Sequence, residues 1–177
     1  MKLYAQFEKE LANRGEKQKL TFNKKWENIC SEIKAHLNDS PASEVGIKIA
    51  TKTHEALYEL YGSKFAGLKL AIWEKGFQSG LNQSQDNHGL SMEMIEWLDA
   101  AMSNYWQNRN REILRKIGTI SDEVILAEFT KSLTEMFGPQ SSLKEELLNK
   151  VLSLNEVPEK TKQLIKKNFN LLLESGL

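Results

Sequence analysis

Apolar residues recur at intervals of three and four positions along almost the whole chain, and no stretch alternates apolar and polar residues as a half-buried strand would. Such spacing places the apolar residues of each segment on one face of an amphipathic helix. The clearest such face is formed by Phe22, Trp26, Ile29, Cys30, Ile33 and Leu37. The sequence therefore predicts an all-α protein of about seven or eight helices.

Glycine, proline and short polar segments divide this pattern into separate helices. We expect Ser40 to cap a helix that begins at Pro41 and ends at Gly62, and Ser142 to form a capping box with Glu145. The helix over 64–75 is apolar on so many sides that we expect it to be the most buried element. The other predicted helices span residues 2–13, 22–37, 90–106, 121–137, 142–154 and 158–174, and the helix over 90–106 has an alternative end at Ile117.

Gly118 and Thr119 mark the expected domain boundary, between a first domain over 1–118 and a C-terminal annex of three helices over 119–177. The last annex helix carries an apolar stripe of Leu164, Ile165, Phe169, Leu172 and Leu173. Three helices alone would bury only part of this stripe. We therefore expect the annex to pack on the first domain or on another subunit, which makes a homodimer one of its two expected arrangements.

Charge and hydropathy exclude several classes of partner. Lys plus Arg and Asp plus Glu both total 24, so the formal net charge is zero and no global field attracts nucleic acid. The N-terminus is charged where a signal peptide would be apolar, and no stretch approaches the roughly 20 apolar residues of a membrane span. We expect a cytoplasmic protein without direct nucleic-acid or membrane binding.

The sequence contains no established catalytic or phosphate-binding motif. Cys30 is the only cysteine, which excludes an internal disulfide and a cysteine-rich zinc site. None of the three histidines has a second histidine or a cysteine three or four residues further on, so no metal site is expected. Only His54, with Glu55 or Glu59, offers a local acid–base pair. We expect a protein that is not an enzyme and has no cofactor.

Aromatic residues crowd the stretch up to residue 106 and are sparse in the annex. Trp and Tyr side chains can line a pocket for a flat organic ligand, and they can equally fill a core. His54, near the middle of its helix, has the same two interpretations: it lines a cleft, or it is hydrogen-bonded at the edge of the core. The polar segment over 78–89 is the only long stretch with loop composition.

Several landmarks between Trp26 and Trp106 resemble the TipAS family, the drug-recognition domain of thiopeptide-responsive MerR-type regulators. They are Lys25-Trp26-Glu27-Asn28-Ile29 at the start of a helix, Asp39-Ser40-Pro41-Ala42-Ser43-Glu44 before the next, His54 midway along that helix, and Gly89-Leu90 leading to Asp99-Ala100-Ala101. Trp73 stands where the family usually has a tyrosine. The segment from Tyr4 to Gly15 is similar to the acidic helix that precedes the family domain and is often disordered until ligand binds.

This resemblance implies a globin-like helical fold without haem, with a cleft for bulky planar or macrocyclic antibiotics. Because the chain begins at the helix before the domain, we expect it to lack the winged-helix DNA reader and to be similar to the stand-alone albicidin-binding resistance proteins. Thiopeptide-binding members capture their ligand through a cysteine, and Gly67-Leu68 occupies that neighbourhood here. The annex has no clear counterpart in a single family unit.

Two functions follow as hypotheses. The first is non-covalent sequestration or sensing of a hydrophobic or aromatic small molecule such as a peptide antibiotic, with the loop over 78–89 as a gate. Its expected wall residues are His54, Tyr58, Tyr61, Trp73 and Trp97. The alternative is a protein-interaction adaptor or dimerisation module that acts through the annex and has no small-molecule ligand.

Overall fold

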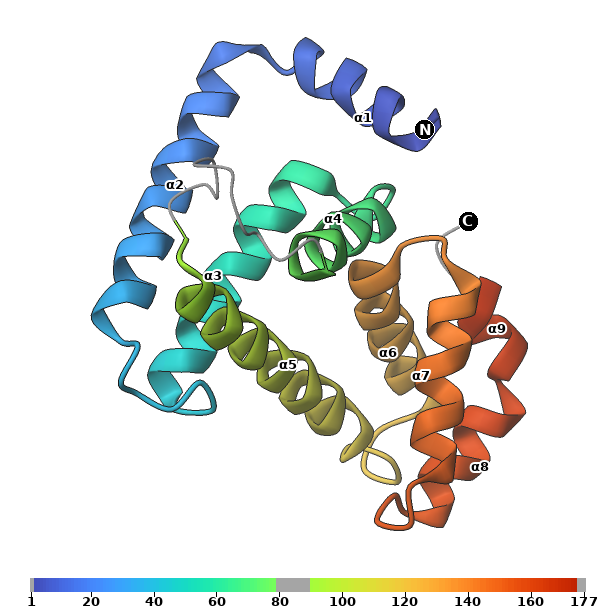
Figure 1. Cartoon of the computed structure of the whole chain (residues 1–177). Helices are drawn as coiled ribbons and strands as arrows, with labels where there is room; N and C mark the ends of the chain where they lie inside the picture. Colours follow the sequence, from blue (N-terminus) through green and yellow to red (C-terminus); the bar gives the residue numbers. More distant parts are fainter. Residues whose placement is uncertain (1, 79–89, 175–177) are drawn as a thin grey trace. The chain divides into compact units, whose positions relative to one another are not determined.

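The computed structural model describes residues 2–78 and 90–174, and their regular structure is helical apart from an isolated bridge between Ile117 and Ile120 (Figure 1). The predicted all-α fold is therefore confirmed. The described residues form nine helices: α1 (Lys2–Asn13), α2 (Gly15–Ala35), α3 (Glu44–Tyr61), α4 (Ala66–Gln78), α5 (Met92–Leu114), α6 (Asp122–Phe137), α7 (Ser141–Ser153), α8 (Glu159–Lys167) and α9 (Phe169–Glu174). The predicted gate over 78–89 lies, apart from its first residue, outside the described residues.

The chain divides into two compact units, and their boundary differs from the predicted one. The first unit is Met1–Gly62 with Leu68–Gln107, and the second is Ser63–Gly67 with Asn108–Leu177. The second unit begins before Gly118 because the end of α5 belongs to its core. Ile113 is buried there, and Leu114 and Ile117 pack against the same cluster.

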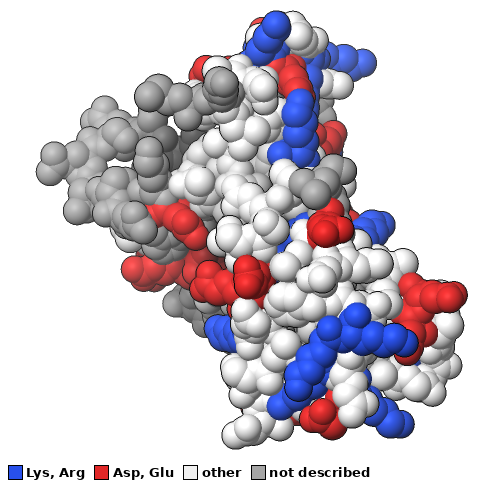
Figure 2. Space-filling model, turned by 90° about the vertical axis from the view of Figure 1, so that its right-hand side faces the viewer, with Lys and Arg blue, Asp and Glu red and all other residues white. Residues whose placement is uncertain are grey.

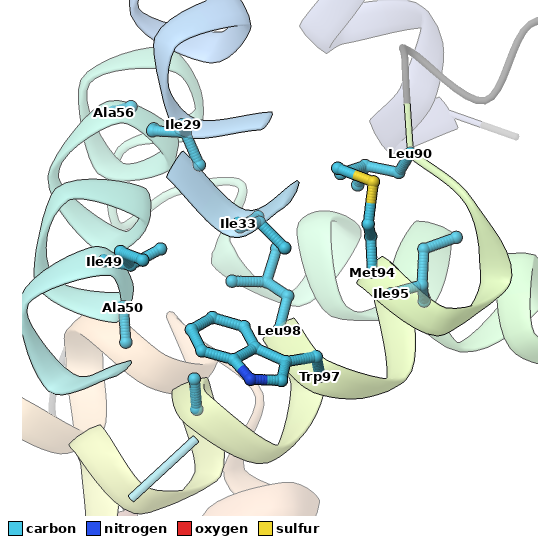
Figure 3. Packing of buried hydrophobic residues seen from close by; sticks show 11 residues of the cluster. Ile29, Ile33, Ile49, Ala50, Ala56, Leu90, Met94, Ile95, Trp97 and Leu98 are labelled. Carbon is cyan, nitrogen blue, oxygen red and sulfur yellow. The ribbon is translucent and has the colours of Figure 1, made fainter. Parts of the chain in front are cut away.

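The core of the first unit is built by α2, α3 and α5, whose apolar faces meet as Figure 3 shows. Ile33 from α2, Ile49 from α3 and Leu98 from α5 are almost completely enclosed. Each of these residues belongs to a stripe with helical spacing, so burying it forces the three helices together. The buried members of the cluster are Ile29, Ile33, Ile49, Ala50, Ala56, Leu90, Met94, Ile95, Trp97, Leu98 and Ala101.

Helix α3 begins three residues after the predicted Pro41, because Ser43 rather than Ser40 is its N-cap. The Ser43 Oγ accepts a hydrogen bond of 3.2 Å from the backbone N–H of Gly46. Pro41 lies in the turn before the helix and comes so close to it that a Cβ at Gly46 would lie 2.2 Å from the Pro41 carbonyl oxygen. Glycine at position 46 therefore allows the turn to fold back onto the first turn of α3.

The apolar stripe of the last predicted helix is buried in the second unit, where it shares a core with α5 residues that the prediction placed in the first domain. Leu164, Ile165 and Leu172 are buried, and Phe169 and Leu173 pack against the same cluster. The stripe finds enough partners because α5 contributes its final residues to this core. The predicted single helix over 158–174 is in fact α8 and α9, which Asn168 separates. At the start of α7, Gln140 is the N-cap and makes no side-chain capping bond, so the predicted capping box is wrong.

The prediction that residues 64–75 form the most buried element is also wrong. Phe65 and Ala66 are buried, but Ile72 is 41% exposed and Trp73 is half-buried. The apolar residues surround α4 instead of forming one stripe, so no single contact face covers them all.

None of the described helices has the length and apolar character needed to cross a membrane.

Candidate functional site

A pocket of about 500 Å³ lies in the first unit, where α1 and α2 meet the end of α3. Small-molecule sites in proteins typically enclose about 300–1,000 Å³, so this pocket has the size of a ligand site. Its lining is supplied by α1, the residue after it, α2 and the last turns of α3: Leu11, Arg14, Gln18, Lys19, Phe22, Asn23, Glu59 and Leu60.

The turn between α1 and α2 shapes one side of this pocket. Gly15 has φ +77°, a left-handed conformation that glycine adopts without steric cost and that other residues rarely adopt. This conformation lets the chain change direction directly after Asn13, so α2 begins at Gly15 instead of near Phe22 as predicted. Leu11 and Phe22, on the two sides of the turn, then line the same pocket.

Two contacts connect α1 and this turn to the end of α3. The Phe7 ring stacks on the Tyr61 ring, with centroids 4.7 Å apart and planes inclined by 8°. The Arg14 Nη1 donates to the backbone carbonyl oxygens of Glu59, at 3.1 Å, and Leu60, at 2.5 Å. These carbonyls belong to the last turn of α3, where the helix dipole is negative and favours a cation. Burial raises the pKa of the Tyr61 hydroxyl, which therefore stays neutral at physiological pH.

The charged groups of the pocket are unequally paired. The Glu59 carboxylate forms an ion pair with Lys25, whereas the Lys19 Nζ lies 3.6 Å from a Glu16 carboxylate that is 94% exposed. An exposed pair at that distance contributes little to stability.

Outside the pocket the surface charge has both signs. The face displayed in Figure 2 carries basic and acidic side chains with uncharged surface between them.

Phe22 is the aromatic wall of the pocket, and a tryptophan supports it from the next helical turn. The rings of Phe22 and Trp26 have centroids 6.1 Å apart and planes inclined by 14°. A flat ligand against Phe22 would therefore extend an existing stack. Trp26 is also placed to report on ligand binding through its fluorescence.

The five residues predicted from sequence as pocket walls do not line this pocket. His54 is buried in an aromatic cluster in the first unit, with ring centroids 5.8 Å from Tyr58, 5.5 Å from Tyr105 and 4.7 Å from Trp106. Of these, Tyr58 is 39% exposed. Tyr61 is nearest to the pocket, since it follows Leu60 and stacks on α1.

Trp73 and Trp97, which were predicted as pocket walls, form hydrogen bonds within the first unit through their indole N–H groups. Trp97 is buried and its Nε1 donates to the backbone oxygen of Asp39 at 2.8 Å, while the Nε1 of half-buried Trp73 donates to Asp99 Oδ1 at 2.9 Å. Each of these contacts connects α5 with another segment of the first unit. The structure therefore gives both tryptophans positions in packing and hydrogen bonding, away from the pocket on α1.

A second pocket, of about 270 Å³, lies between α2 and α3 and is a weaker candidate. Its walls are dominated by charged side chains, among them Lys52 and Glu32, whose Nζ and Oε1 lie 2.6 Å apart. The apolar residues in these walls are Ile29 and Ala56. The larger pocket has larger apolar side chains in its walls, those of Leu11, Phe22 and Leu60.

The pocket was not predicted from the sequence, because the prediction relied on clustered aromatic residues. The feature that shapes the pocket is the turn at Arg14 and Gly15. Arg14 followed by Gly15 was the available signal: a glycine that ends one helix, and beside it a cation able to reach carbonyls elsewhere. No sequence pattern indicates that the carbonyls it meets are those of Glu59 and Leu60, because that contact joins residues 45 and 46 positions apart.

Reactive groups are few in the described part of the chain. No cluster of three or more His, Cys, Asp or Glu residues that could hold a metal ion occurs among those residues. Cys30 is half-buried, and desolvation raises the pKa of its thiol, which lowers its reactivity. The pocket's carboxylate, Glu59, is held by Lys25. The groups that line the pocket are therefore apolar side chains, uncharged polar side chains, two cations and this carboxylate.

Comparison with protein-family models, with curated proteins and with solved structures finds no match to this chain. The resemblance to the TipAS family accordingly rests on the sequence landmarks, and the function has to be inferred from the geometry of the site.

Proposed function

We propose that this protein binds a bulky hydrophobic or aromatic small molecule non-covalently, for sequestration or sensing, in the pocket formed by α1, α2 and the end of α3. The observation that carries this proposal is the pocket itself. It has the volume of a ligand site, and its walls combine the apolar residues Leu11, Phe22 and Leu60 with polar and charged residues, namely Arg14, Gln18, Lys19, Asn23 and Glu59. In small-molecule sites apolar walls supply contact area and polar groups fix the orientation of the ligand.

The resemblance to the TipAS family supports the same proposal from the sequence side. In the family the helix before the domain is often disordered until ligand binds, and the sequence of α1 resembles that helix. The contacts of α1 with the rest of the first unit include the Phe7–Tyr61 stack and the Arg14 hydrogen bonds. A peptide antibiotic with planar rings, bound as in a resistance protein, is therefore the ligand type to test first.

The test uses N-phenyl-1-naphthylamine, an uncharged aromatic probe whose emission rises in apolar surroundings, titrated into the full-length protein. We expect saturable binding with one site per chain, quenching of Trp26, and displacement of the probe by at least one member of a panel of thiopeptides and other aromatic antibiotics. A ligand at 100 times its dissociation constant should also raise the free energy of unfolding by about 2.7 kcal/mol.

Two matched variants locate the site. Leu11→Trp places a large ring at the pocket wall, whereas Leu20→Trp makes the same change at a position that is 57% exposed and does not line the pocket. We expect Leu11→Trp to weaken probe binding at least about tenfold and Leu20→Trp to preserve it. Absence of saturable binding, or equal effects of the two variants, would contradict the proposal.

A further inference from the structure

We propose that the ligand of this pocket is an amphipathic anion: an apolar ring body that carries a carboxylate or another oxyanion, which Arg14 binds. This inference rests on the proposed function and adds the chemical class of the ligand. It follows from how the hydrogen-bond donors of Arg14 are used and from the balance of charge around the pocket.

Arg14 uses only one of its three nitrogens within the described structure. Both of its hydrogen bonds, to the carbonyl oxygens of Glu59 and Leu60, come from Nη1. Among the described residues, Nε and Nη2 make no hydrogen bond. These two nitrogens form the side edge of the guanidinium, and their parallel N–H groups match the two oxygens of a carboxylate or phosphate. The two α3 carbonyls thus hold the Arg14 guanidinium in place at the pocket wall. Its Nε and Nη2 can then donate two parallel hydrogen bonds to an oxyanion.

The charges around the pocket leave a positive excess for such a ligand to neutralise. Three charged side chains line it, Arg14, Lys19 and Glu59. Glu59 is neutralised by Lys25, which lies outside the lining. The helix dipole of α3 places only about half an elementary negative charge at the C-terminal end that Arg14 contacts. Lys19 has only the exposed Glu16 beside it. The lining therefore holds two cations and one carboxylate, which is already shared with Lys25, and an anionic ligand would balance the excess positive charge.

The apolar walls define the other half of the ligand. Leu11, Phe22 and Leu60 surround the same space as the two cations. Phe22 already stacks on Trp26, so a ring is the group that fits best against it. The pocket therefore fits a ligand with an aromatic body at Phe22 and an acidic group at Arg14.

The test compares two probes that share one ring system. 1-Anilinonaphthalene-8-sulfonate carries a sulfonate, whereas N-phenyl-1-naphthylamine has the same rings without the acid. We expect the full-length protein to bind the sulfonate about tenfold more tightly than the neutral probe. A charge-assisted bidentate contact lowers the dissociation constant by about that factor. This preference should decrease between 50 and 500 mM NaCl, since exposed charge contacts are screened by salt.

Arg14→Lys keeps the charge and one donor for the carbonyls of α3 but removes the fork, so the preference for the sulfonate should fall to about threefold or less. Lys19→Gln should reduce the preference, and Lys17→Gln, an exposed lysine on the same helix that does not line the pocket, should preserve it. The Lys19 side chain is 40% exposed and makes no hydrogen bond to α3, so the comparison of the two lysine variants remains informative if Arg14→Lys disturbs folding.

The outcomes separate the two proposals. If neither probe binds at a saturable site, the proposed function itself is wrong. If the neutral probe binds and is displaced by the antibiotic panel, but the sulfonate binds no more tightly, the pocket is a ligand site and the anion inference is wrong. The same conclusion follows if Lys19→Gln and Lys17→Gln change the preference equally.

Discussion

The indole Nε1 of Trp97 donates a hydrogen bond of 2.8 Å to the backbone carbonyl oxygen of Asp39. This bond connects α5 with the turn between α2 and α3, 58 residues earlier in the chain. Trp97 is only 7% exposed, so one side chain both fills the core of the first unit and satisfies a carbonyl of that turn. The turn leads into Ser43, which caps α3. Trp97 thus contributes to the placement of α3, whose last residues line the pocket.

Trp97→Phe should lower the free energy of unfolding by about 1–2 kcal/mol, because it keeps most of the ring packing but leaves the Asp39 carbonyl without its donor. Urea unfolding followed by circular dichroism measures the change. Trp73→Phe is the matched control, since the acceptor of Trp73 is the exposed carboxylate of Asp99. We expect it to cost less than about 0.5 kcal/mol. Equal losses in the two variants would contradict a special role for the Trp97 bond.

Gly46→Ala should be strongly destabilising although it lies in a helix, because its Cβ would lie 2.2 Å from the Pro41 carbonyl oxygen and 2.7 Å from the carbonyl carbon. Backbone atoms must then move, and we expect a loss of about 2–3 kcal/mol. Gly67→Ala provides the comparison in the second unit. Its Cβ would meet the Gln140 side-chain amide at 2.1 Å, which can rotate away, so the change should stay within about 1 kcal/mol. Thermal unfolding of both variants tests this contrast.

The helices could be predicted from the sequence because their signals are local. The bounds of α1 and the end of α6 at Phe137 agree with the prediction, since periodicity and a following glycine or polar residue decide both. Errors arose where two local signals compete, as at Ser40 and Ser43, either of which can cap a helix. Packing also escaped prediction, because residues of α5 after Gln107 join a core whose other members come later in the chain.

The candidate site was harder to predict than the fold. Tyr61 was chosen for its ring, and its neighbour Leu60 lines the pocket. His54 was chosen for its position near the middle of its helix, and it lies within an aromatic cluster. Whether an aromatic residue faces a core or a pocket depends on which helix covers it, and that is a tertiary property. Arg14 carried only the weak signal of a cation beside a helix-ending glycine, and it was not selected.

Arg109 and Glu135 form a largely buried ion pair between α5 and α6, in the second unit. Arg109→Met should cost about 3 kcal/mol, because the Glu135 side chain, only 9% exposed, would keep its charge without that partner. The double variant Arg109→Met with Glu135→Leu should recover most of this loss, since apolar side chains of similar size replace the pair. A double-mutant cycle from urea unfolding measures the coupling. Additive losses would contradict the interpretation that the cost arises from breaking this ion pair.

Lys144 is completely buried in the second unit, where its Nζ donates to the Leu173 carbonyl oxygen at 3.5 Å. Burial lowers the pKa of this ammonium below the ordinary lysine value of 10.5. Between the lowered pKa and 10.5, the unfolded chain holds a proton that the folded chain has released, so the contribution of Lys144 to stability rises with pH. At neutral pH its charge is instead a cost of folding.

Lys144→Met keeps the length of the side chain and removes the buried charge. We therefore expect it to raise the free energy of unfolding by about 1 kcal/mol at pH 7, with the advantage shrinking as the pH rises toward 10.5. Lys150→Met removes a lysine from an exposed position of the same helix and should give no such pH-dependent difference. Urea unfolding of the three proteins from pH 7 to pH 10 measures the slope. If Lys144→Met destabilises the protein equally at every pH, the ammonium stabilises the fold through its hydrogen bonds, and the desolvation cost assigned to it is wrong.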